Sequence, residues 1–268
     1  MFIRSPQFAG TFYPNEPRAL KEMIDKFLHQ ATVEKFDFSP KAIIVPHAGY
    51  IYSGPVAAYG FKILQNYSYQ RIILLGPSHH FSFQGLALSP QGIWETPLGQ
   101  VESLGKENLK EVKNSEEIIE SSEIHEPEHC LEVELPYLQT ILQNFKIIPF
   151  LTGEVNPQQA AGIIDKLLDE TTLLVISSDL SHYYPYHEAQ QLDKVTIDAI
   201  LDNDIQRLEE YGEACGKTGI EVLIEIAQKR KWQSKLLCSL NSGEITGDKS
   251  QVVGYASIGY YSSLNSST

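Results

Sequence analysis

The sequence predicts an α/β fold in which a mixed, largely parallel sheet is flanked by helices. Short apolar runs rich in β-branched residues recur along the chain, as is typical of strands buried on both faces. Stretches with helical spacing of apolar residues lie between them. Neither an internal repeat nor an interdomain linker interrupts this alternation, so residues 1–268 are expected to form a single domain.

The first part of the chain opens with an aromatic, turn-like segment at residues 8–14. Apolar residues at helical spacing then predict a helix over 16–30. A buried strand is expected to end at Pro46, and the small, apolar stretch 54–64 suits a helix packed closely on the sheet. A second buried strand is expected over 71–76.

The middle of the chain is more varied. Residues 85–89 and 92–98 predict shorter strands near an edge of the sheet. The acidic stretch 108–122 predicts a helix with a solvated face. Residues 125–142 begin with a polar cluster and become amphipathic, and Pro136 inside that pattern predicts a kink or a late helix start.

The last part of the chain continues the alternation of strands and helices. Its predicted strands are residues 146–151, 172–178, 235–241 and 252–261, and its predicted helices are residues 157–168, 186–201, 204–211 and 218–230. We expect residues 262–268 to fray.

Composition and charge exclude several classes of function. The net charge of -13 and the pI near 5 disfavour nucleic acid and anionic membranes as partners. No stretch approaches the roughly 20 apolar residues of a membrane helix. The N-terminus lacks the apolar core of a signal peptide, so a cytoplasmic location is expected. The three cysteines, at wide spacing, resemble neither a disulfide framework nor a zinc pair.

Histidines gather where apolar runs end. His47 and His79 follow the two buried strands of the first half, and Asp179 and His182 follow the strand at 172–178. Six of the eight histidines lie in such polar clusters: His47, His79, His80, His125, His129 and His182. Ligands of open α/β sheets bind beyond the carboxyl ends of the strands, so His47 and His79 should meet at one edge.

This pattern predicts a metal site. Two imidazoles and one anionic ligand, either Asp179 or the thiolate of Cys215, would bind a divalent metal and leave positions for substrate. Asp179 could instead orient a histidine through its second ring nitrogen. His182 or His129 could then act as general acid or base, because the pKa of an imidazole lies near neutrality.

Each residue also has a structural interpretation. A lone histidine at a strand end usually caps or bonds within the core, and a lone cysteine such as Cys215 is most often a buried small residue. Asp179 with His182 could cap a helix. His80 is expected to be a hydrogen-bonding neighbour. His125 and His129 have the i, i+4 spacing of one helical face, although a proline lies between them.

Two apparent motifs are rejected. The run C-G-K-T-G lacks the upstream glycine of a P-loop, because Tyr211 stands at that position. Ser78 and Ser181 each precede a histidine, but no G-x-S-x-G elbow accompanies them. Nucleotide binding by a P-loop is therefore not expected, and a serine hydrolase is disfavoured.

Five motifs in order resemble the Memo family, and they run almost from end to end. They are P-H-A-G-Y at 46–50, G-P-S-H-H at 76–80, E-H-C-L-E-V-E-L-P-Y at 128–137, S-S-D-L-S-H at 177–182 and C-G-K-T-G-I at 215–220. The opening A-G-T-F-Y-P fits as well. Prokaryotic members of this family are called AmmeMemoRadiSam system protein B, and the animal member is a mediator of cell motility.

The resemblance implies a fold similar to that of class III extradiol ring-cleavage dioxygenases, which are non-haem iron(II) enzymes. It implies that His47, His79 and Cys215 bind the metal. Asp179, His182 and His129 match motifs of the same pocket. The dioxygenases use a carboxylate where this family has cysteine, and a thiolate is a softer, more oxidisable ligand. Iron(II) is thus the first candidate metal and copper the second.

The leading functional hypothesis is a cytoplasmic, metal-dependent, oxidoreductase-like protein that acts on a small phenolic or reduced substrate. The alternative is a metal-binding or peptide-binding adaptor without turnover, whose groove would be lined by Tyr50, Tyr52, Tyr183 and Tyr184. A third, weaker hypothesis is a hydrolase that uses Asp179, His182 and a serine. The resemblance also implies a functional link to a radical-SAM protein.

Overall fold

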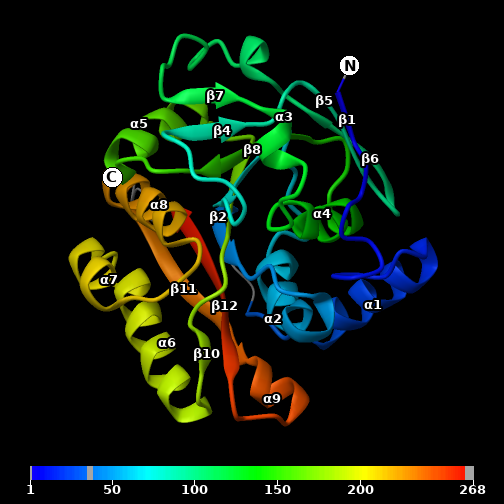
Figure 1. The fold of residues 1–268 in the computed structure, drawn as a ribbon, viewed down its shortest axis with the longest axis vertical. Helices are drawn as coiled ribbons and strands as arrows, with labels where there is room; N and C mark the ends of the chain where they lie inside the picture. The colour runs from blue at the N-terminus through cyan, green and yellow to red at the C-terminus, as the bar shows by residue number, and fades with distance from the viewer. Residues whose placement is uncertain (1, 35–38, 263–268) are drawn as a thin grey trace, which may run out of the picture.

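Four parallel strands form the centre of the sheet in the computed structural model, which describes residues 2–34 and 39–262 (Figure 1). In spatial order they are β8 (Lys146–Thr152), β3 (Arg71–Pro77), β9 (Thr172–Ser177) and β2 (Pro40–Val45). All four were predicted as buried strands. Because they are parallel and adjacent, their carboxyl ends lie at the same edge.

One flank of the sheet is antiparallel and the other combines parallel and antiparallel pairings, so the sheet is mixed and largely parallel, as predicted. On one flank, β12 (Val252–Ser262) pairs with β2, and both β11 (Trp232–Asn241) and β10 (His182–Tyr184) pair with β12. The other flank holds β4 (Leu86–Leu88), β7 (Ile118–Glu120), β6 (Gly99–Ser103), β5 (Gly92–Thr96) and β1 (Phe2–Arg4).

Helices cover both faces of the central strands, on opposite sides of the view in Figure 1. One group consists of α1 (Pro17–Gln30), α2 (Tyr50–Lys62) and α4 (Leu135–Ile141), and the other consists of α5 (Pro157–Leu167), α6 (Tyr186–Leu201), α7 (Ile205–Tyr211) and α8 (Lys217–Arg230). Short helical turns are α3 (Ser122–His125), α9 (Ser242–Thr246), η1 (Lys106–Asn108) and η2 (Glu132–Glu134).

Alternate residues of each central strand enter different cores. In β9, Leu173 and Val175 pack in the core that contains α1 and α2, whereas Leu174 and Ile176 pack in the core that contains α5 and α8. Successive side chains of a strand point to opposite faces, so a strand covered on both sides must be apolar at every position. This requirement explains the continuous apolar runs of the sequence.

Helix starts and ends follow the local sequence closely. Pro136 lies at the start of α4, so the predicted late start is confirmed there. Asn156 caps α5 by accepting a hydrogen bond from the Gln159 amide, and Pro157 occupies the first turn. The helix predicted from residue 54 begins earlier, at Tyr50, directly after the turn that carries His47.

The acidic helix predicted over 108–122 is wrong. The structure has turns there, followed by β7, and Ile118 of β7 pairs with Leu86 of β4. Leu109 and Val112 are buried in the core on the α5 and α8 side. Burial of these apolar residues and pairing with β4 therefore override the helical preference of the acidic residues between them.

Several short elements were not predicted, namely β1, β6, β7, β10 and α9. Ser262, placed in the fraying tail from sequence, is the last residue of β12, and the rest of that tail lies outside the described residues. Among the described residues, no helix is both long enough and apolar enough to cross a bilayer.

Candidate metal centre

The candidate site lies at the carboxyl edge of the central strands. His47 follows β2 by two positions, His79 follows β3 by two and Asp179 follows β9 by two. The His47 and His79 rings meet edge to face, with 5.3 Å between their centroids. The expectation that strand order would bring these histidines together is confirmed.

Cys215 reaches the same place from the turn before α8. Its amide donates a hydrogen bond to the carbonyl of Asp179, and the Asp179 amide donates to Cys215 Sγ at 3.2 Å. Gly216 permits this approach, because a Cβ there would lie 2.8 Å from the carbonyl oxygen of Ser177. Cys215 Sγ lies 3.2 Å from His47 Nε2.

His47, His79 and Cys215 form a group that could hold a metal ion. Each offers one ligand atom, and the three atoms all lie within 4.8 Å of one another. This is the set that the resemblance implied. Two imidazoles and a thiol suit iron, copper or zinc better than magnesium or calcium, which prefer oxygen ligands.

The buried half of the site is built on His47. Its backbone amide donates to Asp179 Oδ1 at 2.8 Å, and its Nδ1 lies 2.8 Å from the Ser177 hydroxyl. Asp179 thus holds the backbone of a histidine and not an imidazole, unlike the ring-orienting role considered from sequence. Burial lowers the pKa of His47 well below its usual value, and His129 and His79 lower it further.

The more open half is built on Glu128, which the sequence analysis did not single out. Its carboxylate lies 2.9 Å from His79 Nδ1 and 3.1 Å from His129 Nδ1, and it accepts the backbone amides of His79, His129 and Cys130. Burial alone would raise the pKa of Glu128, but the hydrogen bonds from His129 and His79 hold it well below its usual value.

This arrangement explains a second cluster of potential metal ligands, formed by His79, Glu128 and His129. The carboxylate in that cluster already accepts hydrogen bonds from both rings, so the cluster is a hydrogen-bonded support and not a separate cation site. In a neutral imidazole with its proton on Nδ1, Nε2 has a free lone pair. Those nitrogens are available to bind a metal or accept a proton.

Burial also sets the protonation of the anionic candidates. It raises the pKa of the Cys215 thiol to about 12, and the nearby Asp179 charge acts in the same direction. It raises the pKa of Asp179 to about 6, although the hydrogen bond from the His47 amide opposes the shift. Without a metal, Cys215 is therefore a neutral thiol at pH 7.

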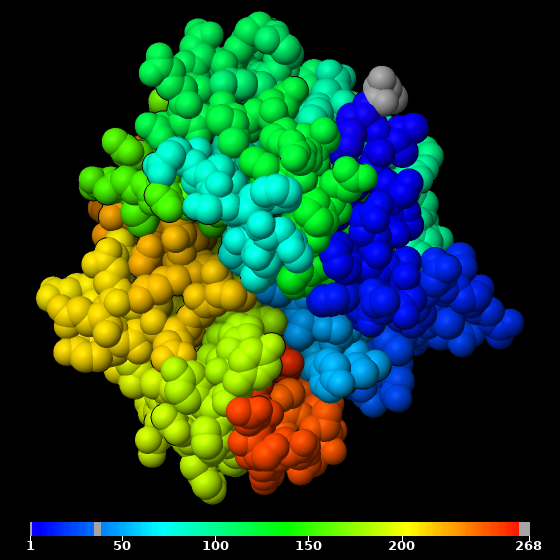
Figure 2. All heavy atoms as spheres, in the orientation of Figure 1, coloured from blue at the N-terminus to red at the C-terminus, as the bar shows by residue number. Residues whose placement is uncertain are grey.

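A pocket of about 640 Å³ opens over these residues. All of His47, His79, His129, Asp179 and His182 line it, so five of the six predicted site residues share one cavity. The sixth, Cys215, is not among its lining residues but contacts Nε2 of His47. Its aromatic walls are Phe12, Tyr52, Tyr183 and Tyr255. Phe12 also packs against the His129 ring, with centroids 4.7 Å apart. Figure 2 shows the contributing segments, coloured blue, cyan, yellow-green and red, meeting on one face.

Two of the clustered histidines lie apart from this pocket. His80 is exposed. His125 is fully buried, and its Nε2 donates to the carbonyl of Ala87. The i, i+4 pair is therefore split, because α3 ends at His125 and the chain turns before His129. Asp179 and His182 do not cap a helix, since β10 begins at His182.

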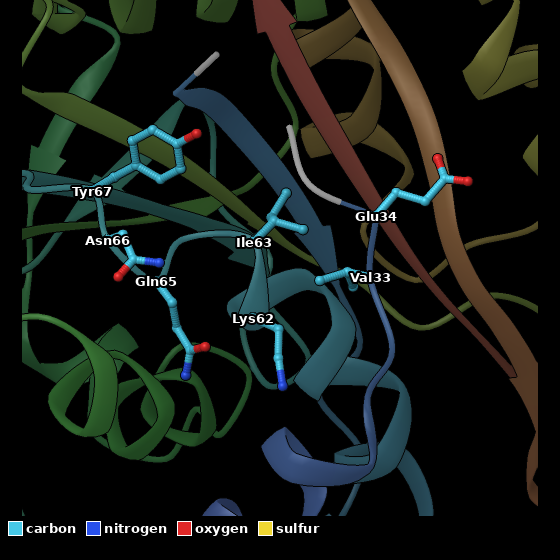
Figure 3. A pocket seen from close by; sticks show the side chains of 7 residues that line it. All are labelled: Val33, Glu34, Lys62, Ile63, Gln65, Asn66 and Tyr67. Carbon is cyan, nitrogen blue, oxygen red and sulfur yellow. The ribbon is translucent and has the colours of Figure 1, made fainter. Parts of the chain in front are cut away.

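A second surface pocket has different chemistry. Figure 3 shows it at the end of α2, lined by Val33, Glu34, Lys62, Ile63, Gln65, Asn66 and Tyr67. Glu34 forms an ion pair with Lys235, and Lys62 donates to the carbonyl of Leu28. Among the described residues that line it there is neither histidine nor cysteine, so it offers no metal ligand of the kind found at the strand ends.

Comparison with known proteins points to one family. A family model described as Memo-like protein matches residues 4–259. The chain is 36% identical over 265 residues to a MEMO1 family protein of Thermoplasma volcanium, covering 96% of this chain and 97% of that protein. It is 37% identical over 272 residues to a MEMO1 family protein of Aquifex aeolicus, covering 95% and 98% respectively. The similarity therefore spans every residue of the site.

Proposed function

The chain belongs to the Memo-like protein family, and from that premise we propose that it is a metal-dependent, oxidoreductase-like protein. Iron(II) is the first candidate metal and copper the second. The observation that carries the proposal is the group of ligand atoms from His47, His79 and Cys215 within 4.8 Å of one another. Two imidazoles and one thiolate leave coordination positions for a substrate.

The donor set fits such a metal. Ser177 and Glu128 engage Nδ1 of His47 and His79, so the Nε2 atoms carry the free lone pairs. Cys215 would bind as a thiolate and release its proton on metal binding. A bound metal would supply Lewis-acid and one-electron chemistry, and the thiolate ligand favours softer ions.

Residues of the chain would handle protons around the substrate. His129 has Nδ1 fixed by Glu128, so its Nε2 can accept a proton as a general base. His182 lines the same pocket from β10. Asp179 anchors the amide of His47 and adds a carboxyl group with a pKa of about 6, which can exchange a proton near neutral pH.

The pocket favours a small aromatic substrate. Four aromatic side chains form its walls, and its described lining residues include no lysine or arginine. A carboxylate or phosphate ester would find no lysine or arginine there to pair with, whereas a phenol could stack on the aromatic walls and bind the metal through its oxygen. We therefore propose a phenolic or similarly reduced small molecule as substrate.

A binding protein without turnover is the second candidate function. It is favoured by the exposed aromatic rim of the pocket, where Tyr52 is 40% exposed and Tyr183 is 69% exposed. Such side chains often anchor peptide partners. In this case the ligand would be a peptide, and a radical-SAM protein, implied by the resemblance, is one candidate partner.

Metal analysis tests the first proposal. The parent, purified without oxygen and supplied with iron(II) or copper, should retain about one ion per chain, as expected for one three-ligand site. Cys215→Ser and the His47→Ala, His79→Ala double variant should lose it. Cys238→Ser, a cysteine in β11 outside the pocket, is the matched control. Equal retention by the double variant and the parent would refute the site.

Turnover then separates the two candidate functions. The iron-loaded parent should consume oxygen with some member of a panel of phenols and catechols, and the double variant should not. A loaded parent that is inert to the whole panel but binds peptides at micromolar concentration would favour the adaptor.

A further inference from the structure

Ser177 makes three short contacts through one hydroxyl group. Its Oγ lies 2.8 Å from His47 Nδ1, 2.7 Å from the carbonyl oxygen of Cys130 and 2.8 Å from Glu134 Oε1. All of these groups are buried at the end of β9, behind the candidate metal ligands. At such distances each contact needs a proton between its two atoms, because two lone pairs would repel.

Counting protons determines the arrangement. Three contacts require three protons, and the Ser177 hydroxyl supplies only one. The carbonyl of Cys130 can only accept, so the Ser177 proton goes to it. The two remaining contacts must be donated to Ser177 Oγ, one by Nδ1–H of His47 and the other by Glu134.

We propose that Glu134 is a neutral carboxylic acid that, through Ser177, fixes His47 in the tautomer with its proton on Nδ1. Glu134 is a positioning residue in this proposal, since it reaches His47 only through the hydroxyl. The consequence is that Nε2 of His47 keeps its lone pair and faces Cys215 Sγ. The proton count does not depend on a metal, and the proposal rests on the proposed function only for what this tautomer serves.

The surroundings of Glu134 agree with a neutral acid. Its side chain is buried, with 1% of the residue exposed, and no ion pair to it is present among the described residues. Burial raises the pKa of Glu134 well above its usual value, and the nearby Asp179 raises it further. An ionised carboxylate without such compensation would be strongly disfavoured there.

Glu128 provides an internal contrast, six positions earlier in the chain. It is equally buried, with 2% exposed, but three backbone amides and two imidazole N–H groups surround its carboxylate. Every contact to Glu128 already has its proton from the partner, so this carboxylate is ionised. The same side chain therefore takes opposite charge states within one site.

Infrared spectroscopy tests the charge of Glu134 directly. A protonated carboxyl has a C=O stretch that is separate from carboxylate bands and shifts in D₂O. The difference spectrum between metal-free parent and Glu134→Gln at pH 7 should show loss of this band. The matched spectrum for Glu128→Gln should show loss of carboxylate bands instead. A spectrum for Glu134→Gln that loses only carboxylate bands would overturn the proposal.

Two NMR measurements on the parent protein need no variant to fold. One reports the charge of the glutamate and the other reports the tautomer of His47. In parent protein with carbon-13 in the glutamate side-chain carboxyl, one resonance at pH 7 should have the shift of a protonated acid. With nitrogen-15 histidine, the His47 ring should show a protonated Nδ1 and a bare Nε2. Absence of a protonated glutamate, or a proton on Nε2 of His47, would overturn the proposal even where iron binding holds.

The conservative variant distinguishes positioning from packing. The amide of Glu134→Gln can still donate to Ser177, so it should keep the His47 tautomer and bind iron(II) as the parent does. Glu134→Leu fills similar space without a donor, so His47 should populate both tautomers and iron(II) should bind about tenfold more weakly. Equal tautomer populations in the two variants would contradict the positioning role.

Discussion

The two imidazoles of the candidate metal group are held in the same orientation by opposite means. Nδ1 of His79 contacts the ionised carboxylate of Glu128. Nδ1 of His47 contacts the Ser177 hydroxyl, which in turn contacts Glu134, the acid inferred to be neutral. Both arrangements place the proton on Nδ1 and leave Nε2 for a metal. Only one of them adds a negative charge beside the metal position.

The supply of hydrogen-bond donors, and not the depth of burial, decides the charges of these two buried acids. Glu128 and Glu134 are almost equally inaccessible, with 2% and 1% of each residue exposed. Five N–H groups converge on Glu128, so its charge is stabilised in place of water. Glu134 meets a hydroxyl that is already committed to a carbonyl.

The largest loss is expected from Glu128→Gln. Four of the five N–H groups contact Oε1 and only the His79 amide contacts Oε2, so the new NH₂ group would face the His79 amide or, in the flipped orientation, the other four donors. At least one backbone amide would lose its acceptor, and both imidazoles would lose the negative charge beside them. We expect a loss of about 3 kcal/mol in the free energy of unfolding and about 10- to 100-fold weaker iron(II) binding. Chemical denaturation and metal titration measure the two effects. Glu221→Gln, a buried glutamate of α8 outside the site, should leave iron(II) binding unchanged.

Glu128 was not predicted from the sequence, whereas the strand ends were. The strands before His47, His79 and Asp179 could be predicted because strands covered on both faces are apolar throughout. Parallel pairing then placed the polar residues that follow them at one edge. Cys215 had a weaker signal: the residues left it as one of two candidate anionic ligands beside Asp179, and the resemblance to a family favoured it.

The supporting acids were missed for a physical reason. The stretch 128–134 contains three glutamates and resembles a solvated polar segment, yet all three are buried. Their partners are distant in sequence, such as Arg4 for Glu132 and Ser177 for Glu134. The available signal was local: Glu134 lies between Val133 and Leu135, inside an apolar pattern, where a charged side chain is unexpected.

An intermediate loss of stability and of iron(II) affinity is expected from Ser177→Ala. This change removes the hydroxyl between His47 and Glu134 and leaves the contacts of Glu128 intact. The change removes the acceptor for His47 and Glu134 and the donor to Cys130, so the free energy of unfolding should fall by about 2 kcal/mol. His47 should then populate both tautomers, and iron(II) should bind about tenfold more weakly. The matched control is Ser257→Ala, a fully buried serine that donates to the carbonyl of Val56. If both serine variants bind iron(II) equally, the hydroxyl does not support the site.

The smallest change in the free energy of unfolding is expected from Glu134→Gln. Whether the variant is less or more stable than the parent should depend on pH. In the folded chain the pKa of Glu134 is raised by burial, whereas in the unfolded chain it is near 4.5. The acid therefore contributes its full stability below about pH 4.5. That contribution declines as pH rises towards the folded value, by up to about 1.4 kcal/mol per pH unit. Glutamine does not titrate, so the stability of the variant should not decline with pH for this reason.

The free energy of unfolding of parent and variant, measured by urea denaturation from pH 4.5 to 8, should show this crossing. At pH 4.5 the variant should be equal to the parent or weaker by less than about 1 kcal/mol. Its stability relative to the parent should then rise steadily with pH. An ionised Glu134 would give the reverse trend, in which the variant becomes less stable than the parent as pH rises. The reason is that a carboxylate that accepts a hydrogen bond stabilises the fold only above its unfolded pKa. The sign of the slope of this stability difference against pH thus shows whether Glu134 is neutral or, like Glu128, ionised.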